Sequence, residues 1–189
     1  LRYVSTLHAL GCAIEYLPAE PDLPDAVFVE DTAVVLDELA IITRPGAASR
    51  RAETATTATF LGSLRPLHFI QAPGTLDGGD VLRVGRTLFV GQTPRSNEAG
   101  IRQLAALTES AGYVVLSIPV VGCLHLKSAV TALASNLLLI NPAWVDPAGF
   151  AASMSFIPVD PAEPFAANAL PIGGTIIHPE EFPRTRQRI

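Results

Sequence analysis

Three short segments combine an acid or a histidine with apolar, strand-like neighbours, and these residue types could carry chemistry. They are residues 28–31 (Phe-Val-Glu-Asp), 76–80 (Leu-Asp-Gly-Gly-Asp) and 124–127 (Leu-His-Leu-Lys). Because a carboxylate buried without a partner is costly, several carboxylates converging on one pocket predict a cationic ligand. A histidine beside them predicts proton transfer. Together the segments predict an enzyme site for a guanidinium-like cation.

These segments must be positioned by secondary structure, and the chain repeats one unit of two strands, a helix and a further strand. The expected strand pairs are residues 32–36 and 39–43, 80–84 and 87–91, 125–132 and 136–141, and 169–172 and 175–178. The expected helices are residues 1–10, 49–61 and 96–111, a short helix after Pro147 and one begun by residues 182–189; the expected closing strands are 13–17, 67–71, 113–119 and 155–159. Five units, the first and last incomplete, is the simplest count.

Repeats of roughly 45 residues form either an open solenoid or a closed ring, and an open stack needs polar end units. Neither end of this chain resembles such a cap, so we expect a five-bladed, pseudo-symmetric α/β propeller. Residues 1–189 would be one domain that lacks N- and C-terminal segments, since the chain begins with Leu1 inside an expected helix. The acids and His125 fall where one blade ends and the next begins, so they should meet near the axis.

Composition limits the classes of function. The 189 residues are 49% hydrophobic and 16% charged, which fits a folded domain, and the longest apolar stretches are too short to cross a bilayer. The net charge of −5, without a basic run interleaved with aromatics, argues against nucleic acid and suits a small cationic ligand. The two cysteines, Cys12 and Cys123, give neither a disulfide framework nor a metal-binding spacing. We therefore expect a cytoplasmic protein without a metal or another cofactor.

Four motifs, in this order, carry a resemblance to a known family. They are Asp25 with residues 27–32, then residues 75–82, 91–97 and 124–128. The chain resembles the guanidino-group modifying enzymes, which have the pentein fold, and among them the dimethylarginine dimethylaminohydrolases. The resemblance implies hydrolysis of N-methylated L-arginine to L-citrulline and a methylamine by a cysteine thiolate that attacks the guanidinium carbon. It also implies methylarginine clearance, which relieves inhibition of nitric-oxide-forming enzymes.

The resemblance implies two catalytic residues. His125 would protonate the leaving amine, and Asp77 would lie beside it. This agrees with elementary chemistry, because an amine leaves poorly unless it is protonated and an imidazole titrates near the working pH.

The resemblance further implies a set of substrate-binding residues. Acids would hold the guanidinium flat through paired hydrogen bonds, while arginines and one more acid would recognise the amino-acid end. These residues are Glu30 and Asp31 for the guanidinium, and Asp25, Arg50 and Arg95 for the amino acid.

The nucleophilic cysteine is expected beyond residue 189, because in the family it lies on the strand that closes the last blade. Cys123 is a weaker candidate, since it would share a strand face with His125. A free cysteine in an apolar run is more often a small buried hydrophobe, and we expect this of Cys12 as well.

Other functions remain open at this point. Arginine deiminases and amidinotransferases share the fold, a guanidino-ligand binding protein could keep the acids without the nucleophile, and a structural ring would bind nothing. For residues 77–80 the simplest structural explanation is a tight turn in which Asp80 only supports the loop. The expected partner is a small substrate, with no nucleic acid and no membrane; a homodimer is left open.

Overall fold

Four small sheets follow one another along the chain, and three of them repeat a single pattern. In each of these three, the first strand pairs antiparallel with the second, and the second pairs parallel with the third. The strands are β1 (Ala33–Val35), β2 (Ala40–Ile42) and β3 (Leu67–Phe69); β4 (Val81–Val84), β5 (Thr87–Gln92) and β6 (Val114–Pro119); β7 (Val130–Ala134), β8 (Leu137–Ile140) and β9 (Ser155–Pro158); and β10 (Leu170–Ile172) with β11 (Thr175–Ile177). The predicted α/β class is confirmed.

α-Helices and 3₁₀ helices connect the strands. The α-helices are α1 (Arg2–Ala9), α2 (Thr54–Gly62), α3 (Glu98–Thr108), α4 (Leu126–Ala129) and α5 (Pro183–Arg186). The 3₁₀ helices are η1 (Val29–Thr32), η2 (Ala48–Glu53), η3 (Gly78–Asp80), η4 (Glu109–Ala111) and η5 (Pro147–Gly149). Across residues 2–189 no helix has the length and apolar character needed to cross a membrane.

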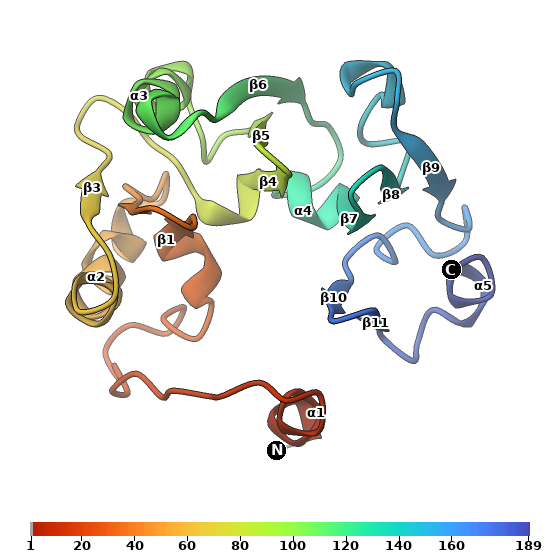
Figure 1. Ribbon diagram of the computed structural model, residues 1–189, viewed down its shortest axis with the longest axis horizontal. Helices are drawn as coiled ribbons and strands as arrows, with labels where there is room; N and C mark the ends of the chain where they lie inside the picture. The colour runs from red at the N-terminus through yellow and green to blue at the C-terminus, as the bar shows by residue number, and fades with distance from the viewer. Residues whose placement is uncertain (1) are drawn as a thin grey trace.

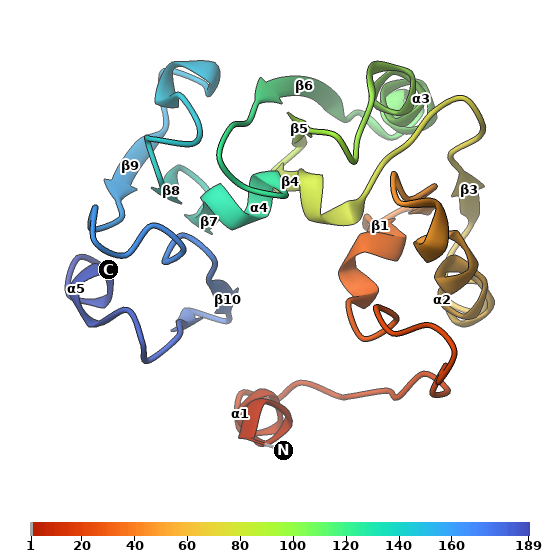
Figure 2. The ribbon, with the colours of Figure 1, turned by 180° about the vertical axis from the view of Figure 1, so that it is seen from behind.

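The computed structural model, which describes residues 2–189, arranges the units around an arc (Figure 1). Helices α2 and α3 lie on the outside of the arc, and β1, β4, β7 and β10 lie toward its inside, as the view from behind also shows (Figure 2). Helix α1 approaches the last unit, where Arg2 forms an exposed ion pair with Glu180 at 2.9 Å. The inner strands and the loops before them therefore face a common centre.

The hydrophobic core lies between neighbouring units. One buried cluster joins residues of the first unit, such as Val34 and Ile41, to Leu88 and Leu104 of the second. The central strands are the most apolar because both of their faces are covered, as in β8 with the sequence Leu-Leu-Leu-Ile. A smaller cluster of Ala40, Ile42 and Leu61 lies within the first unit, so the connecting loops are placed by packing both between and within units.

An outer clasp also ties the first two units together. Arg83 binds Asp37 with both terminal nitrogens at 3.1 and 2.6 Å, and Arg86 pairs with Glu38 at 2.5 Å. The ring of Tyr113 lies between these pairs, 4.7 Å from the Arg86 guanidinium carbon, and its hydroxyl donates to Glu38. The clasp thus adds contacts between the first two units at partly exposed side chains.

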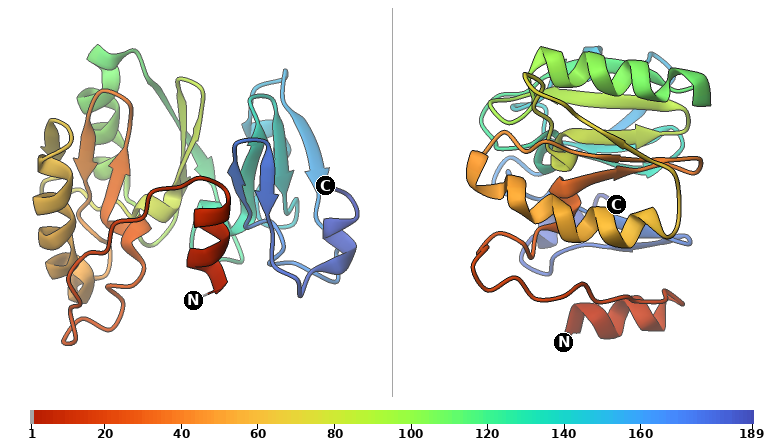
Figure 3. Two further views of the ribbon diagram at one scale, coloured as in Figure 1. Left: turned by 60° about the horizontal axis from the view of Figure 1, so that its bottom comes forward. Right: turned by 90° about the vertical axis from the view of Figure 1, so that its left-hand side faces the viewer.

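Two predicted elements are wrong. Residues 13–17 form no strand; they belong to an irregular connection that runs from α1 toward η1 (Figure 3) and pairs with no strand of residues 2–189. The strand predicted for residues 125–132 begins only at Val130, because a helical turn, α4, comes first. The amide of Leu126 donates to the buried Asp80 carboxylate, which turns the chain here. The helix predicted for residues 1–10 is α1, although Leu1 lies outside the described residues.

Candidate active site

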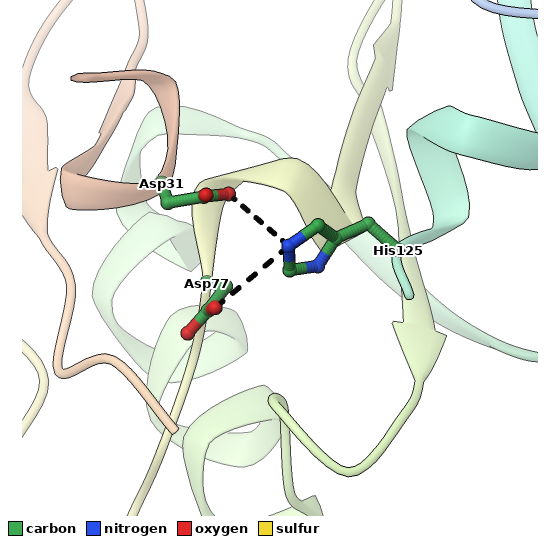
Figure 4. A group of neighbouring side chains, drawn as sticks. All are labelled: Asp31, Asp77 and His125. Carbon is green, nitrogen blue, oxygen red and sulfur yellow. Dashed lines mark ion pairs between the residues drawn. The ribbon is translucent and has the colours of Figure 1, made fainter. Parts of the chain in front are cut away.

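Three side chains from three different junctions meet at one point (Figure 4). Asp31 lies in η1, Asp77 directly precedes η3, and His125 directly precedes α4. The Nε2 atom of His125 lies 3.6 Å from Oδ1 of Asp31 and 3.9 Å from Oδ2 of Asp77. The side chain of His125 is 12% exposed, that of Asp31 is 10% exposed and that of Asp77 is fully buried. The structure thus brings together the segments that the sequence singles out.

Two glycines allow this close approach. A Cβ atom on Gly79 would lie 2.6 Å from Oδ1 of Asp31 and 3.0 Å from the ring of His125, and one on Gly78 would collide with the carbonyl of Glu30. The backbone amide of Gly79 instead donates to Asp31 at 2.9 Å. The Gly-Gly pair is therefore not a hairpin turn: η3 brings bare backbone against the acid and the histidine.

Asp31 is held by a buried arginine. Its Oδ2 accepts from Nη1 of Arg50 at 2.6 Å, and Glu53 grips the other side of the same guanidinium at 2.7 and 2.9 Å. The carbonyls of Asp25 and Phe28 accept from Nη2, the same nitrogen that donates to Glu53 at 2.7 Å. Burial lowers the pKa of Arg50, but Glu53 and Asp31 outweigh it, so the pKa lies above its usual value. Arg50 is bound within the chain, and its contact with a substrate stays a prediction.

Asp77 has one oxygen without a partner. Its Oδ1 accepts from the amide of Gly46 at 2.8 Å, whereas Oδ2 is buried and has no hydrogen-bond partner within residues 2–189. The nearest cationic groups are His125 and Arg95, each at 3.9 Å. Burial raises the pKa of Asp77, the Gly46 amide opposes that rise, and the charge of Asp31 adds to it. This oxygen is free to accept from an N–H donor that enters the site.

Replacing Asp77 with asparagine is expected to stabilise the protein while impairing its chemistry. A folded-state pKa above the unfolded one means that stability is complete below the ordinary carboxyl pKa and is lost as the pH rises through the raised value. Above the ordinary carboxyl pKa, the burial of Asp77 therefore costs folding free energy, and asparagine removes that cost. Each 1 kcal/mol gained would raise Tm by about 2–4 °C in a chain of this size. Calorimetry at pH 7 and pH 3 measures the difference, which should shrink at the lower pH.

The matched control for this change is Asp22→Asn, because Asp22 is exposed and outside the site. Its Tm should equal that of the unmodified protein at both pH values. A lower Tm for Asp77→Asn at pH 7 would contradict the account of Asp77.

The environment of His125 favours its protonated form. Burial lowers the pKa of His125, but the nearby carboxylate of Asp80, together with the charges of Asp31 and Asp77, outweighs burial and raises the pKa above its usual value. Oδ1 of Asp80 lies 3.4 Å from Nδ1, a distance typical of an ion pair rather than of a short hydrogen bond. An imidazolium aimed between two carboxylates can donate a proton to a group bound there.

The other predicted binding residues lie farther out. Glu30 is exposed and forms an ion pair with Lys127 at 2.7 Å, while Arg95 is 27% exposed beside Asp77. Asp25 lies in an exposed turn whose carbonyl binds Arg50. The roles assigned to these residues stay predictions.

Three contacts were not predicted from the sequence, namely those of Glu53, Asp80 and Lys127. Glu53 follows Arg50 by three residues in a helical segment, a spacing that brings side chains together and could have signalled the pair. For Asp80 and Lys127 the partners are 46 and 97 residues away in the chain, so no local signal exists.

The surroundings of Cys123 do not favour a nucleophile. The thiol of Cys123 donates to the backbone carbonyl of His125 at 3.3 Å, and burial raises its pKa, so the thiolate is disfavoured. Cys12 is also a free, half-buried thiol.

Asp31, Asp77 and His125 could also meet a metal ion, because one ligand atom from each lies within 4.8 Å of the others. Both oxygens of Asp31, however, already accept from Arg50 and Gly79. A metal would have to compete with these bonds, and the metal-free site stays a prediction.

A cavity of about 1060 Å³ borders the site. Glu30, Gly78 and Lys127 line it, together with apolar residues of the first unit, but Asp31, Asp77 and His125 do not. The cavity therefore reaches the rim of the site, and the three side chains themselves lie outside its lining.

The chain has relatives among known proteins and solved structures. No family model matches it. It is 50% identical over 139 residues to the N(G),N(G)-dimethylarginine dimethylaminohydrolase of Streptomyces coelicolor, covering 72% of this chain and 54% of that protein. It is 35% identical over 189 residues to the enzyme of the same name from Pseudomonas aeruginosa, covering 99% and 74%. The chain thus spans about half the length of the first relative and about three quarters of the length of the second.

Similar solved structures lead to the same group of enzymes as these relatives. A Cys-to-Ser variant of the Pseudomonas aeruginosa enzyme, complexed with citrulline, superposes with a TM-score of 0.91 at 33% identity, covering 99% of this chain and 74% of that one. An amidinotransferase from Microseira wollei, 16% identical and covering 99% and 72%, has a TM-score of 0.81 and shows the shared fold alone. The predicted pentein fold is confirmed, and the chain belongs to the dimethylarginine dimethylaminohydrolase family.

Proposed function

We propose that the protein hydrolyses N-methylated L-arginine to L-citrulline and a methylamine. The observation that carries the proposal is the unpartnered, buried Oδ2 of Asp77, which faces Nε2 of His125 beside Asp31. Two carboxylates and an imidazolium meet at one point. The carboxylates can accept hydrogen bonds from guanidinium N–H groups, and the imidazolium can give a proton to a leaving amine. The names of the relatives supply the substrate class.

Binding would begin with the charge of the substrate. Asp77 gains the hydrogen bond it lacks when a guanidinium N–H reaches Oδ2, so a buried acceptor is satisfied on binding. Asp31 contributes a second negative charge but keeps its bonds to Arg50 and Gly79, which hold it still. The flat guanidinium is thereby oriented with its carbon exposed to attack.

The reaction would proceed in two halves. A cysteine thiolate attacks the guanidinium carbon, and the bond from that carbon to the methylated nitrogen breaks as Nε2 of His125 gives its proton to the leaving amine. Water then adds to the same carbon, loses a proton to Nε2, and expels the thiolate, leaving the urea group of citrulline. The proposal takes the thiol from outside the printed sequence, because Cys12 and Cys123 are not placed for attack.

Glu30 is assigned, with Asp31, to the guanidinium, and recognition of the amino-acid end is assigned to Asp25, Arg50 and Arg95. Arg95 is the arginine with freedom to act, since it is half-buried and its closest carboxylate contact is 3.9 Å away. We also place the protein in the cytoplasm, and we treat a homodimer as a state to be checked by mass in solution.

The proposal is tested with Asp31→Asn in the protein expressed from its complete gene. Loss of a charged hydrogen-bond partner costs about 1.5–3 kcal/mol, so the KM for dimethylarginine should rise by roughly 10- to 100-fold. Citrulline and dimethylamine are measured together, with Tm as the check on folding and Asp22→Asn as the control. An unchanged KM would remove Asp31 from the binding pocket.

The unmodified protein separates the rival functions in the same assay. Equal amounts of citrulline and dimethylamine support the proposal. Ammonia released from unmethylated arginine in preference to dimethylarginine would identify a deiminase instead, and binding of dimethylarginine without product would identify a binding protein.

A further inference from the structure

The carboxylate of Asp80 lies against the side of His125 that faces away from the substrate position. It is fully buried and accepts three hydrogen bonds, from the amide of Leu126 at 3.0 Å, from Thr93 Oγ1 at 2.7 Å and from Ser96 Oγ at 2.6 Å. Its Oδ1 also lies 3.4 Å from Nδ1 of His125. Such a carboxylate cannot rotate away, because each oxygen is tied to a different part of the chain.

We propose that Asp80 is a positioning residue that keeps the proton on Nδ1 of His125, so that Nε2 alone exchanges protons with the substrate. The identity of the reaction rests on the proposed function. The assigned tautomer, however, is a property of the protein without substrate, and it can be measured separately.

The two ring nitrogens of His125 have different surroundings. Nδ1 is buried and has no hydrogen-bond partner within hydrogen-bonding geometry among residues 2–189, and Asp80 is the acid beside it. Nε2 points toward Asp31 and Asp77, as Figure 4 shows. If the neutral ring carried its proton on Nε2, the lone pair of Nδ1 would face the Asp80 carboxylate, and two buried acceptors would oppose each other. A proton on Nδ1 turns that contact into donor and acceptor.

The packing around Asp80 supports a fixed position. A Cβ atom on Gly91 would lie 3.1 Å from Oδ1 of Asp80 and 2.9 Å from Cβ of Leu126, so the carboxylate lies against bare backbone. Ser96 also accepts from the amide of Asp77 at 3.1 Å, which joins the two acids through one hydroxyl. The acid at Nδ1 and the acid at Nε2 are therefore placed by the same small network.

This arrangement would let one atom serve both halves of the reaction. After Nε2 gives its proton to the leaving amine, the ring is neutral with its proton on Nδ1, and Nε2 presents a lone pair to the incoming water. The ring need not turn between the steps. In serine proteases a buried aspartate on Nδ1 has this role, holding the tautomer while stabilising the charged ring.

Several charged side chains surround His125 or lie at the rim of the site. Asp31 and Asp77 face Nε2, Asp80 faces Nδ1, and Arg95 and Lys127 lie at the rim. A purely structural Asp80 would serve only to hold the amide of Leu126 and the hydroxyls, and it would leave the tautomer of His125 undetermined.

The decisive measurement is the tautomer of His125, by ¹⁵N NMR of the histidine-labelled protein without substrate, at a pH where the ring is neutral. The His125 signals are assigned by their loss in His125→Gln. We expect Nδ1–H for His125. His178 is an internal reference with the opposite tautomer. Its Nε2 lies 2.8 Å from the carbonyl of Ala166, so Nε2 should carry the proton. A neutral His125 with its proton on Nε2 would overturn the proposal.

Two variants extend the test to catalysis. Asp80→Asn should mix the tautomers of His125 and lower kcat by roughly 10²- to 10⁴-fold with little change in KM. Ser96→Ala removes one bond to the carboxylate but leaves its charge, so the Nδ1–H tautomer should persist and kcat should fall less. If Asp80→Asn does not fold, the ¹⁵N spectra of Ser96→Ala and of the unmodified protein still decide the question. Loss of kcat in Asp80→Asn without any change of tautomer would count against the proposal.

Failure of the proposed function gives a different pattern. A protein that forms no citrulline but shows Nδ1–H on His125 would contradict the hydrolase proposal and support the role of Asp80. A protein that forms citrulline with the proton on Nε2 would do the reverse.

Discussion

Replacing His125 with glutamine is expected to lower citrulline formation from dimethylarginine by about 10²- to 10⁴-fold, the range typical of a lost general acid. Glutamine fills a similar space and keeps a hydrogen-bond donor, but it cannot give a proton to the departing amine. The effect should fall on kcat, because the acids that hold the guanidinium remain. Steady-state kinetics on the protein expressed from its complete gene provides the measurement.

His8→Gln is the matched control, since His8 is exposed on α1 and lies outside the site. Its turnover should equal that of the unmodified protein. Near-normal turnover by His125→Gln, with an unchanged fold, would remove His125 from the mechanism.

Replacing Glu53 with alanine is expected to cost about 3–5 kcal/mol of stability, because it leaves the buried Arg50 guanidinium with one carboxylate instead of two. The side chains of Arg50 and Glu53 are 7% and 2% exposed, so water cannot replace the lost partner. Tm should fall by about 2–4 °C for each kcal/mol. Glu53→Gln keeps the shape and some hydrogen bonds, so its loss should be smaller. Urea unfolding and calorimetry give both values.

The chain offers a matched exposed pair as the control. Glu98 and Arg102 are also an acid and an arginine one helical turn apart, at 2.5 Å, but their side chains are 80% and 67% exposed. Glu98→Ala should cost only about 0.3–0.5 kcal/mol. Equal losses in the two alanine variants would show that burial does not determine the strength of the Arg50 pair.

The strands of the fold were largely predictable because their signal is local. An apolar run bounded by turn residues predicted the strand at residues 136–141, observed as β8 (Leu137–Ile140). Such a run does not show whether another strand is available to pair with it, which is why residues 13–17 were wrongly predicted as a strand. It also does not reveal that a distant carboxylate binds the amide of Leu126 and starts a helical turn.

The site was predictable in its residue types but not in its internal bonds. Acids and a histidine at unit junctions indicated Asp31, Asp77 and His125, and the structure brings all three together. Whether Arg50 faces solvent or a buried acid depends on packing between segments, which the sequence does not state. The same holds for Asp80, whose place in a Gly-Gly-Asp segment suggested a simple turn.

Three of the backbone-amide bonds that build the site cross large stretches of chain. The amide of Gly79 reaches Asp31 over 48 residues, that of Leu126 reaches Asp80 over 46, and that of Gly46 reaches Asp77 over 31. Contacts of such separation form only after the units have docked, because loop closure must come first. The exchange of these three amide hydrogens with deuterium would therefore report opening between the units directly, and a variant that loosens the ring should lose their protection together.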